Sequence, residues 1–213
     1  HSLGEYTALV CSNAVDFRTA IDVVRFRGQV MQQAVPLGQG AMAAILGLED
    51  ADLDAACREA AQGEVVEPVN FNAPGQTVIA GNATAVARAI EAAKSRGAKR
   101  AVLLPVSVPS HSSLMRGAAE RLASKLATVD VRLPSVADVY TVDVRKHASP
   151  DGIRQSLKEQ LFKPVRWAET IRAMLAGGAT TFVECGPGKV LTSLNRRIER
   201  RPDLRLLALE DST

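Results

Sequence analysis

Ser2 and Gly4 stand directly before a stretch, residues 5–11, whose composition favours a helix. A serine on a tight turn before a helix forms the second half of a nucleophile elbow, G-x-S-x-G, in which helical N–H groups stabilise an oxyanion. The spacing S-x-G is a weak pattern by itself, because serine also caps helices. Ser2 is therefore a candidate nucleophile, although a helix cap is the commoner explanation.

His111 is the candidate base for such a nucleophile. It follows a predicted strand and precedes a predicted helix, in a loop of small residues, and functional side chains often lie in loops of this kind. A single histidine in a loop is more often a surface residue. Serine before histidine is nevertheless the chain order of α/β-hydrolase-like sites, so the two candidates support each other.

Arg27 occupies an unusual position on a helix predicted over residues 16–34. Asp16 is suited to cap this helix. The apolar residues with helical spacing are Phe17, Ala20, Ile21, Val24, Gly28 and Met31. At about 100° per residue, Arg27 lies only about 20° from Ala20, at the border of the face predicted to be buried. An arginine whose aliphatic stem follows the edge of the core explains this position without any function.

Six elements in the middle of the chain follow the order β-α-β-β-α-β, which is the ferredoxin-like pattern. Their predicted ranges are 41–46, 50–61, 65–72, 76–81, 84–96 and 101–106. Later helices are predicted over 113–126, 153–161, 164–175 and 190–198, and later strands over 136–142 and 180–185. Strands that alternate with helices outside the ferredoxin-like unit predict an α/β parent domain into which that unit is inserted.

Length and composition exclude several classes of protein. The 213 residues suffice for a large domain with a substantial core. No apolar run approaches the roughly 20 residues of a membrane span, and the mixed charges, with a net charge of +3, exclude a dedicated nucleic-acid arm. Three cysteines far apart argue against a disulfide framework and for the cytoplasm. No Cys/His cluster has metal-ligand spacing, so we expect no metal.

The segment Gly186-Pro187-Gly188-Lys189 precedes a predicted helix and has some likeness to a phosphate cradle. It lacks the spacing of a Walker A loop. The favoured interpretation is a turn between a strand and a helix.

The segment His1-Ser2-Leu3-Gly4-Glu5-Tyr6 resembles the G-H-S-L-G-E-[YF] elbow of malonyl-CoA:acyl-carrier-protein transacylases of dissociated bacterial fatty acid synthesis. The similarity runs over nearly the whole chain, through Arg27-Gly28-x-x-Met31-Gln32, Gly40-Ala41-Met42-Ala43-Ala44-Ile45, Asn70-Phe71-Asn72-x-Pro74-Gly75-Gln76, Pro105-Val106-Ser107-Val108-Pro109-Ser110-His111 and Glu184-x-Gly186-Pro187-Gly188-Lys189-Val190-Leu191. Together these blocks are highly specific. The resemblance implies an α/β-hydrolase-like parallel-sheet domain, residues 1–38 and 106–213, with a ferredoxin-like (βαββαβ) subdomain, residues 39–105, inserted.

The resemblance also implies the catalytic roles. Ser2 corresponds to the family's nucleophile and His111 to its catalytic histidine. The family has no triad carboxylate, and the backbone carbonyl at the position of Gln160 orients the imidazole. The N–H of Leu3 corresponds to one oxyanion donor.

Three further residues match positions that bind substrate in the family. Arg27 corresponds to the arginine that binds the malonate carboxylate, which accounts for its unusual helical position. A planar guanidinium suits a carboxylate because it can hold both oxygens. Met31 and Asn72 are the other two positions.

The implied activity is ping-pong transfer of a malonyl group in fatty acid biosynthesis. The group passes from malonyl-CoA to Ser2, and from the malonyl-serine ester to the phosphopantetheine thiol of an acidic acyl carrier protein. No cofactor takes part. We expect a cytoplasmic monomer that binds neither nucleic acid nor membrane.

The start of the sequence adds an expectation about activity. No initiator Met precedes His1, and the family's G-Q-G segment, which supplies the second oxyanion donor, has no counterpart in the sequence. We therefore expect a chain that lacks the N-terminal segment of its parent protein and is weak or inactive alone.

Two alternatives from other classes remain open. A serine thioesterase or esterase would use the same serine and histidine but would not need Arg27. A non-catalytic fragment would bind the carrier protein and never acquire an acyl group.

Overall fold

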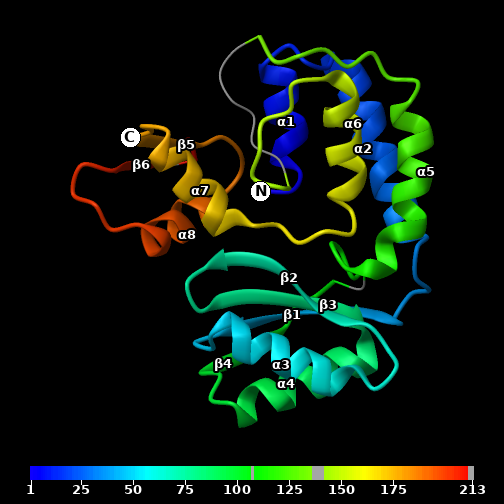
Figure 1. Ribbon diagram of the computed structural model, residues 1–213, viewed down its shortest axis with the longest axis vertical. Coiled ribbons are helices and arrows are strands. Elements are labelled where there is room, and N and C mark those ends of the chain that lie inside the picture. The colour runs from blue at the N-terminus through cyan, green and yellow to red at the C-terminus, as the bar shows by residue number, and fades with distance from the viewer. Residues whose placement is uncertain (107, 136–141, 211–213) are drawn as a thin grey trace.

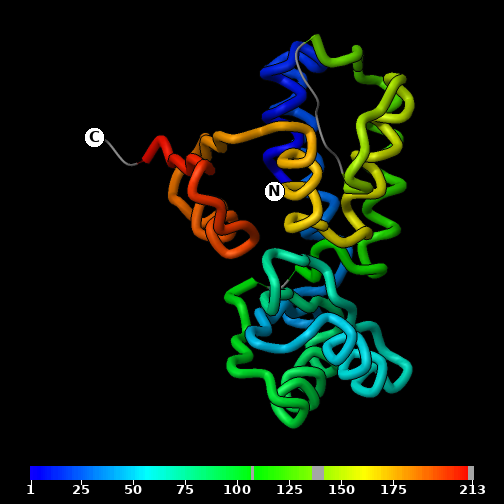
Figure 2. Tube along the Cα trace, turned by 60° about the vertical axis from the view of Figure 1, so that its left-hand side comes forward, coloured from blue at the N-terminus to red at the C-terminus, as the bar shows by residue number. Residues whose placement is uncertain are grey.

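The computed structural model describes residues 1–106, 108–135 and 142–210. Three groups of elements surround the N-terminus, a helical group, a four-stranded sheet with its helices, and a smaller α/β unit (Figure 1). Figure 2, turned by 60°, shows the N-terminus between the same three groups. Residues at the start of the chain are therefore positioned by distant parts of the sequence.

The helical group has one common core. It consists of α1 (Gly4–Cys11), α2 (Phe17–Gln32), α5 (Arg116–Leu126) and α6 (Pro150–Glu159), with a short 3-10 turn, η1 (Ser113–Met115), before α5. Side chains from all four helices are buried together, among them Leu9, Val23, Leu122 and Leu157. This packing fixes the start of α1 relative to the end of α6.

Two of these helices begin at side-chain caps. The Asp16 carboxylate accepts a hydrogen bond from the Thr19 N–H at the start of α2, as the sequence predicts. The Ser149 hydroxyl accepts from the Gly152 N–H at the start of α6, and Pro150 occupies the first turn. Proline suits this position because its missing N–H would have no helical partner. Helix α6 therefore begins three residues before the predicted start at Ile153.

The prediction of which face of α2 is buried is partly wrong. Phe17 is 64% exposed and Ile21 is also exposed. The buried residues of the helix are Ala20, Val23, Val30 and Met31. Apolar residues occur on more than one face of this helix, and packing against the rest of the helical group decides which face is covered. Arg27 is half-buried, in agreement with its predicted place at the border.

The β-α-β-β-α-β prediction is confirmed. Strands β1 (Gly40–Leu46), β2 (Val66–Ala73), β3 (Gln76–Asn82) and β4 (Arg100–Leu103) form one antiparallel sheet in the order β2-β3-β1-β4. Helices α3 (Asp50–Ala61) and α4 (Ala83–Ser95) cover one face of this sheet (Figure 1). Leu53 and Val86 from these helices are buried against Ile79 of β3. The last strand ends at Leu103, three residues before the predicted end.

Strand β2 ties this sheet to the rest of the molecule. The Phe71 N–H donates to the Val165 carbonyl, and the Val165 N–H donates to the Val69 carbonyl, both at 2.9 Å. The Glu67 carboxylate accepts from the Ser113 N–H at 2.7 Å. These bonds link the sheet to the segment just after His111 and to the segment just after Gln160.

The smaller unit contains α7 (Trp167–Ala176), β5 (Thr181–Glu184), α8 (Val190–Ile198) and β6 (Arg205–Ala208). Strands β5 and β6 are parallel neighbours, and β6 has no counterpart among the predicted elements. Helix α7 begins at Trp167 rather than Pro164, because the backbone of Val165 pairs with β2. The strand predicted over 136–142 lies outside the described residues, except for Val142, which is in a turn.

The chain thus has an α/β fold, with an antiparallel sheet, a pair of parallel strands and covering helices. Within the described ranges, no helix is both long and apolar enough to cross a bilayer. Cys11, Cys57 and Cys185 are free thiols.

Gly81 should not tolerate a side chain. A Cβ at this position would lie 1.9 Å from the Val65 carbonyl oxygen, which is backbone and cannot move aside. We expect Gly81→Ala to lower the free energy of unfolding by about 3 kcal/mol or more, as in other overpacked sites. Gly117→Ala is the control, since nothing lies within 4 Å of its Cβ position on α5. Urea unfolding of both variants measures the difference, and equal stabilities would contradict the expectation.

Candidate active site

Ser2 is placed at the start of α1 but does not cap it. Leu3 is the N-cap residue, and no side chain caps this helix. The Ser2 hydroxyl instead donates to Gln160 Oε1 at 3.3 Å and accepts from Arg27 Nη2 at 2.8 Å. The helix-cap explanation of Ser2 is therefore wrong, and its hydroxyl belongs to a cluster of polar groups from α1, α2 and the end of α6.

His111 is buried beside this cluster. Its imidazole is only 5% exposed, and Nδ1 lies 2.6 Å from the backbone carbonyl oxygen of Gln160. Gln160 is the C-cap of α6, and carbonyls at a helix C-terminus lack helical partners and carry partial negative charge. A proton on Nδ1 satisfies this carbonyl, which leaves the lone pair on Nε2.

The backbone of His111 is strained and anchored. Its φ is +67°, a left-handed conformation that non-glycine residues adopt at a cost. Its N–H donates to the Leu161 carbonyl at 2.9 Å. The bonds from its backbone and from its ring to adjacent carbonyls hold the imidazole at the end of α6.

The environment keeps His111 neutral near neutral pH. Burial, together with the charge of Arg27, lowers the pKa of His111 to about 4, while bonds to the backbone of Gln160 and Lys163 oppose the shift. A neutral imidazole whose Nε2 carries a lone pair is suited to accept a proton. Across the described residues, no hydrogen bond joins His111 to the Ser2 hydroxyl, which bonds to Arg27 and Gln160 instead.

Arg27 brings a cation into contact with the serine. Nη2 donates to Ser2 Oγ and, at 3.1 Å, to Gln160 Oε1. The guanidinium carbon lies 5.8 Å from the centre of the Tyr6 ring, and Nε has no partner in the described structure. Burial lowers the Arg27 pKa, but the ordinary value is so high that the group stays charged. A charged, incompletely paired guanidinium beside a hydroxyl can receive a carboxylate.

Asn72 lies at the edge of the site, and Met31 lies in the core that supports it. Asn72 Oδ1 lies 2.8 Å from His1 Nε2, and the His1 ring packs against Trp167 at 5.7 Å between centroids. Met31 is buried in the core of the helical group. Leu3 is 53% exposed and occupies the N-cap position, where backbone N–H groups lack helical partners.

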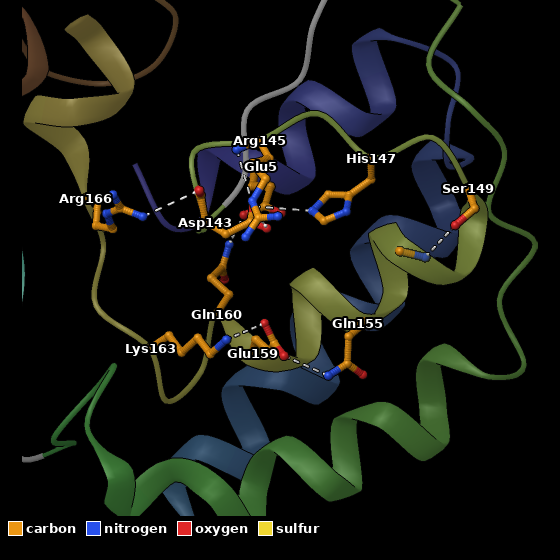
Figure 3. A network of polar contacts seen from close by, with 11 residues as sticks. Glu5, Asp143, Arg145, His147, Ser149, Gln155, Glu159, Gln160, Lys163 and Arg166 are labelled. Carbon is orange, nitrogen blue, oxygen red and sulfur yellow. Dashed lines mark hydrogen bonds and ion pairs between the residues drawn. The ribbon is translucent and has the colours of Figure 1, made fainter. Parts of the chain in front are cut away.

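Glu5 is a residue of the site that the sequence-based reasoning did not single out. Its side chain is 8% exposed, and Oε2 accepts from Gln160 Nε2 at 2.6 Å. Figure 3 shows Gln160 pointing from the end of α6 toward Glu5 on α1. Burial raises the pKa of Glu5 to about 7, although Gln160 and the charge of Arg27 oppose the shift. Its position one helical turn after Ser2 was the available signal.

The turn at Gly186–Gly188 does not form an open anion site. The Glu184 carboxylate accepts from the Leu191 and Thr192 N–H groups at the start of α8, at 3.0 and 2.7 Å. A carboxylate of the chain itself therefore occupies this helix N-terminus, in agreement with a structural turn. Among residues 1–106, 108–135 and 142–210, no group of side chains is suited to hold a metal ion.

A serine just before a helix, an arginine bonded to that serine and a buried neutral histidine held by the backbone of Gln160 can support acyl transfer. The acyl transferase domain family matches residues 1–202, and the chain belongs to this family.

Two relatives with similar sequences are malonyl transferases. The chain is 54% identical to the malonyl CoA-acyl carrier protein transacylase of Escherichia coli O157:H7. The aligned region of 198 residues covers 93% of this chain and 64% of the relative. An acyl carrier protein S-malonyltransferase structure from Vibrio cholerae superimposes with a TM-score of 0.95 at 53% identity, over 98% of this chain and 68% of that one.

A third relative has been solved as a complex. It is a malonyl-transacylase bound to a type II PKS acyl-carrier protein, 50% identical, with a TM-score of 0.93 over 98% of this chain and 66% of that chain. The chain thus spans about 64% of the length of the curated E. coli relative.

Proposed function

We propose that this chain carries the active site of a malonyl-CoA:acyl-carrier-protein transacylase, which transfers a malonyl group through an ester on Ser2. The observation that carries the proposal is the 2.8 Å contact between the Arg27 guanidinium and Ser2 Oγ. A receptor for a free carboxylate beside the nucleophile fits a malonyl group, whose carboxylate lies close to its thioester. The names of the relatives agree with this substrate.

The proposed reaction has two half-reactions. The malonyl carboxylate binds Arg27 and draws the guanidinium from the Ser2 hydroxyl. Nε2 of His111 takes the Ser2 proton, Ser2 Oγ attacks the thioester carbonyl, and CoA leaves as its thiol with that proton. The phosphopantetheine thiol of the carrier protein then loses its proton to His111 and attacks the ester, and Ser2 regains a proton.

The oxyanion of each tetrahedral intermediate requires donors. The N–H of Leu3, at the start of α1, is the donor that we propose from this chain, and the positive end of the helix dipole adds to it. Met31 and Asn72 are proposed to line the substrate site, Met31 by shaping its floor and Asn72 through its contact with His1.

We further propose that residues 1–38 and 106–213 form an α/β-hydrolase-like parallel-sheet domain into which residues 39–105 are inserted as a ferredoxin-like subdomain. The parallel pair β5–β6 and the four-stranded sheet order support this division. The carrier partner is an acidic acyl carrier protein, which suits the net charge of +3, and one relative was solved with a type II PKS acyl-carrier protein. We propose that the protein is cytoplasmic, which agrees with its free cysteines, and that it is a monomer.

Intact-protein mass spectrometry after mixing with malonyl-CoA tests the function. A malonyl adduct that a carrier thiol then removes would support transfer. An adduct that water removes equally fast would favour a thioesterase or esterase. If the 213-residue chain binds carrier protein but gains no adduct, the mass measurement is repeated with a protein of the relatives' full length. No adduct on either protein would overturn the proposal.

Arg27 should decide which acyl group is accepted. We expect Arg27→Ala to slow acylation by malonyl-CoA about 10²- to 10³-fold, because the substrate carboxylate would be buried without a partner. Acylation by acetyl-CoA should change little. Arg25→Ala, an exposed arginine of the same helix, is the matched control and should behave as the unchanged chain. Equal losses with both thioesters would argue against carboxylate binding by Arg27.

A further inference from the structure

Gln160 contacts all the principal groups of the site, through its side chain and its backbone. It is 1% exposed. Its Nε2 donates to the Ser2 carbonyl at 2.9 Å and to Glu5 Oε2 at 2.6 Å, while its Oε1 accepts from Ser2 Oγ and Arg27 Nη2. The backbone carbonyl of the same residue meets His111 Nδ1. A rotation of this one amide would therefore disturb both the serine and the arginine.

The partners of the amide determine its orientation. A guanidinium only donates hydrogen bonds, so the atom facing Arg27 must be Oε1. The Ser2 carbonyl only accepts, so the atom facing Ser2 O and Glu5 must be Nε2. Of the two acceptors, Glu5 makes the shorter bond.

The buried carboxyl of Glu5 is expected to destabilise the fold, so its presence in the site suggests a function. A buried carboxyl is destabilising unless it is paired, and Oε1 of Glu5 has no hydrogen-bond partner in the described structure. Burial alone would favour the protonated acid, while Arg27 and the Gln160 amide favour the ionised form. The ionised form of Glu5 is therefore stabilised by Arg27 and Gln160, which also contact the Ser2 hydroxyl.

We propose that Glu5 is a positioning residue for acyl transfer: by accepting the Nε2–H of Gln160, it holds the amide with Oε1 toward Ser2 and Arg27. This inference rests on the proposed function, because acyl transfer is the reaction that the orientation of the amide would serve. A glutamine at position 5 would keep the size of the side chain and could donate as well as accept. The Gln160 amide could then turn and set Nε2 against Arg27, donor against donor.

The first test uses a serine-directed fluorophosphonate, so it does not depend on malonyl-CoA. We expect Glu5→Gln to slow labelling of Ser2 about 10-fold, the loss expected for one hydrogen bond, with an unchanged melting temperature. Gln160→Met removes the amide and keeps the backbone carbonyl. The double variant should be no slower than Gln160→Met alone, because Glu5 acts through the amide. Glu159→Gln, which alters the neighbouring exposed ion pair with Lys163, should label normally.

Additive losses in the double variant, or normal labelling of folded Glu5→Gln, would overturn the proposal. A second measurement needs no variant at position 5. In protein labelled with 15N-glutamine, the side-chain NH2 signals that disappear in Gln160→Met should exchange slowly with solvent, as bonded protons do. Fast exchange would contradict the proposal. If malonyl-CoA fails to acylate Ser2 while these results hold, the proposed function fails and the role of Glu5 stands.

Discussion

Replacing Ser2 with alanine is expected to abolish the malonyl adduct and to reduce carrier-dependent transfer by at least about 10³-fold, the scale seen when a covalent nucleophile is removed. The Ser2 hydroxyl lies against Arg27 and can form an ester. Arg27 and His111 would remain in place but would have no oxygen to activate. Intact mass after mixing with malonyl-CoA measures the adduct directly.

The control for this variant is Ser193→Ala, an exposed serine on α8 whose hydroxyl donates to the Lys189 carbonyl. It should form the adduct as the unchanged chain does. An adduct of equal yield on Ser2→Ala would show that another residue is acylated and would remove Ser2 from the mechanism. Binding of carrier protein by Ser2→Ala without an adduct agrees with either a transacylase or a non-catalytic fragment, so the unchanged chain decides between them.

Replacing His111 with alanine is expected to slow acylation of Ser2 about 10²- to 10⁴-fold, the usual contribution of a positioned base. The pH profile gives a second test. Because burial lowers the pKa of His111 to about 4, the imidazole is already neutral at pH 6. The rate should therefore be independent of His111 titration above about pH 5 and should fall as the pH drops through 4, where the protonated ring can no longer accept a proton.

The control is His147→Gln, since His147 faces Asp143 at 3.4 Å in the loop before α6 (Figure 3) and belongs to no proposed step. This variant should keep both the rate and its pH profile. A rate that instead follows a group with the ordinary histidine pKa near 6.5 would mean that His111 is more exposed to water than its 5% accessibility implies.

The residues of the ferredoxin-like unit could be predicted from the sequence because each element carries its own signal. Leu53 and Cys57 recur with helical spacing on α3, and both are buried. Glycines mark the turns, as at Gly75, whose φ of +65° favours a residue without a side chain. The need for glycine at Gly81 was not predictable, since it arises from the approach of Val65 in a neighbouring segment.

The candidate site was only partly predictable. Ser2, His111 and Arg27 could be proposed from their residue types, their positions in elements and a family resemblance. The Ser2 hydroxyl bonds to Arg27, 25 residues away, and to Gln160, 158 residues away. No local pattern specifies such contacts. The roles proposed for these residues stay predictions, and the structure adds the distances and burial on which they depend.

The sequence by itself determined the local elements and the chemistry available, because helical spacing, caps and turn glycines act over a few residues. Only the tertiary structure decided which face of α2 is buried, where β6 pairs with β5, and that Glu5 meets Gln160 inside the site. Each of these depends on segments distant in sequence that exclude water together. Burial then sets the charge states of Glu5 and His111, since the loss of water shifts a pKa that residue type alone leaves unchanged.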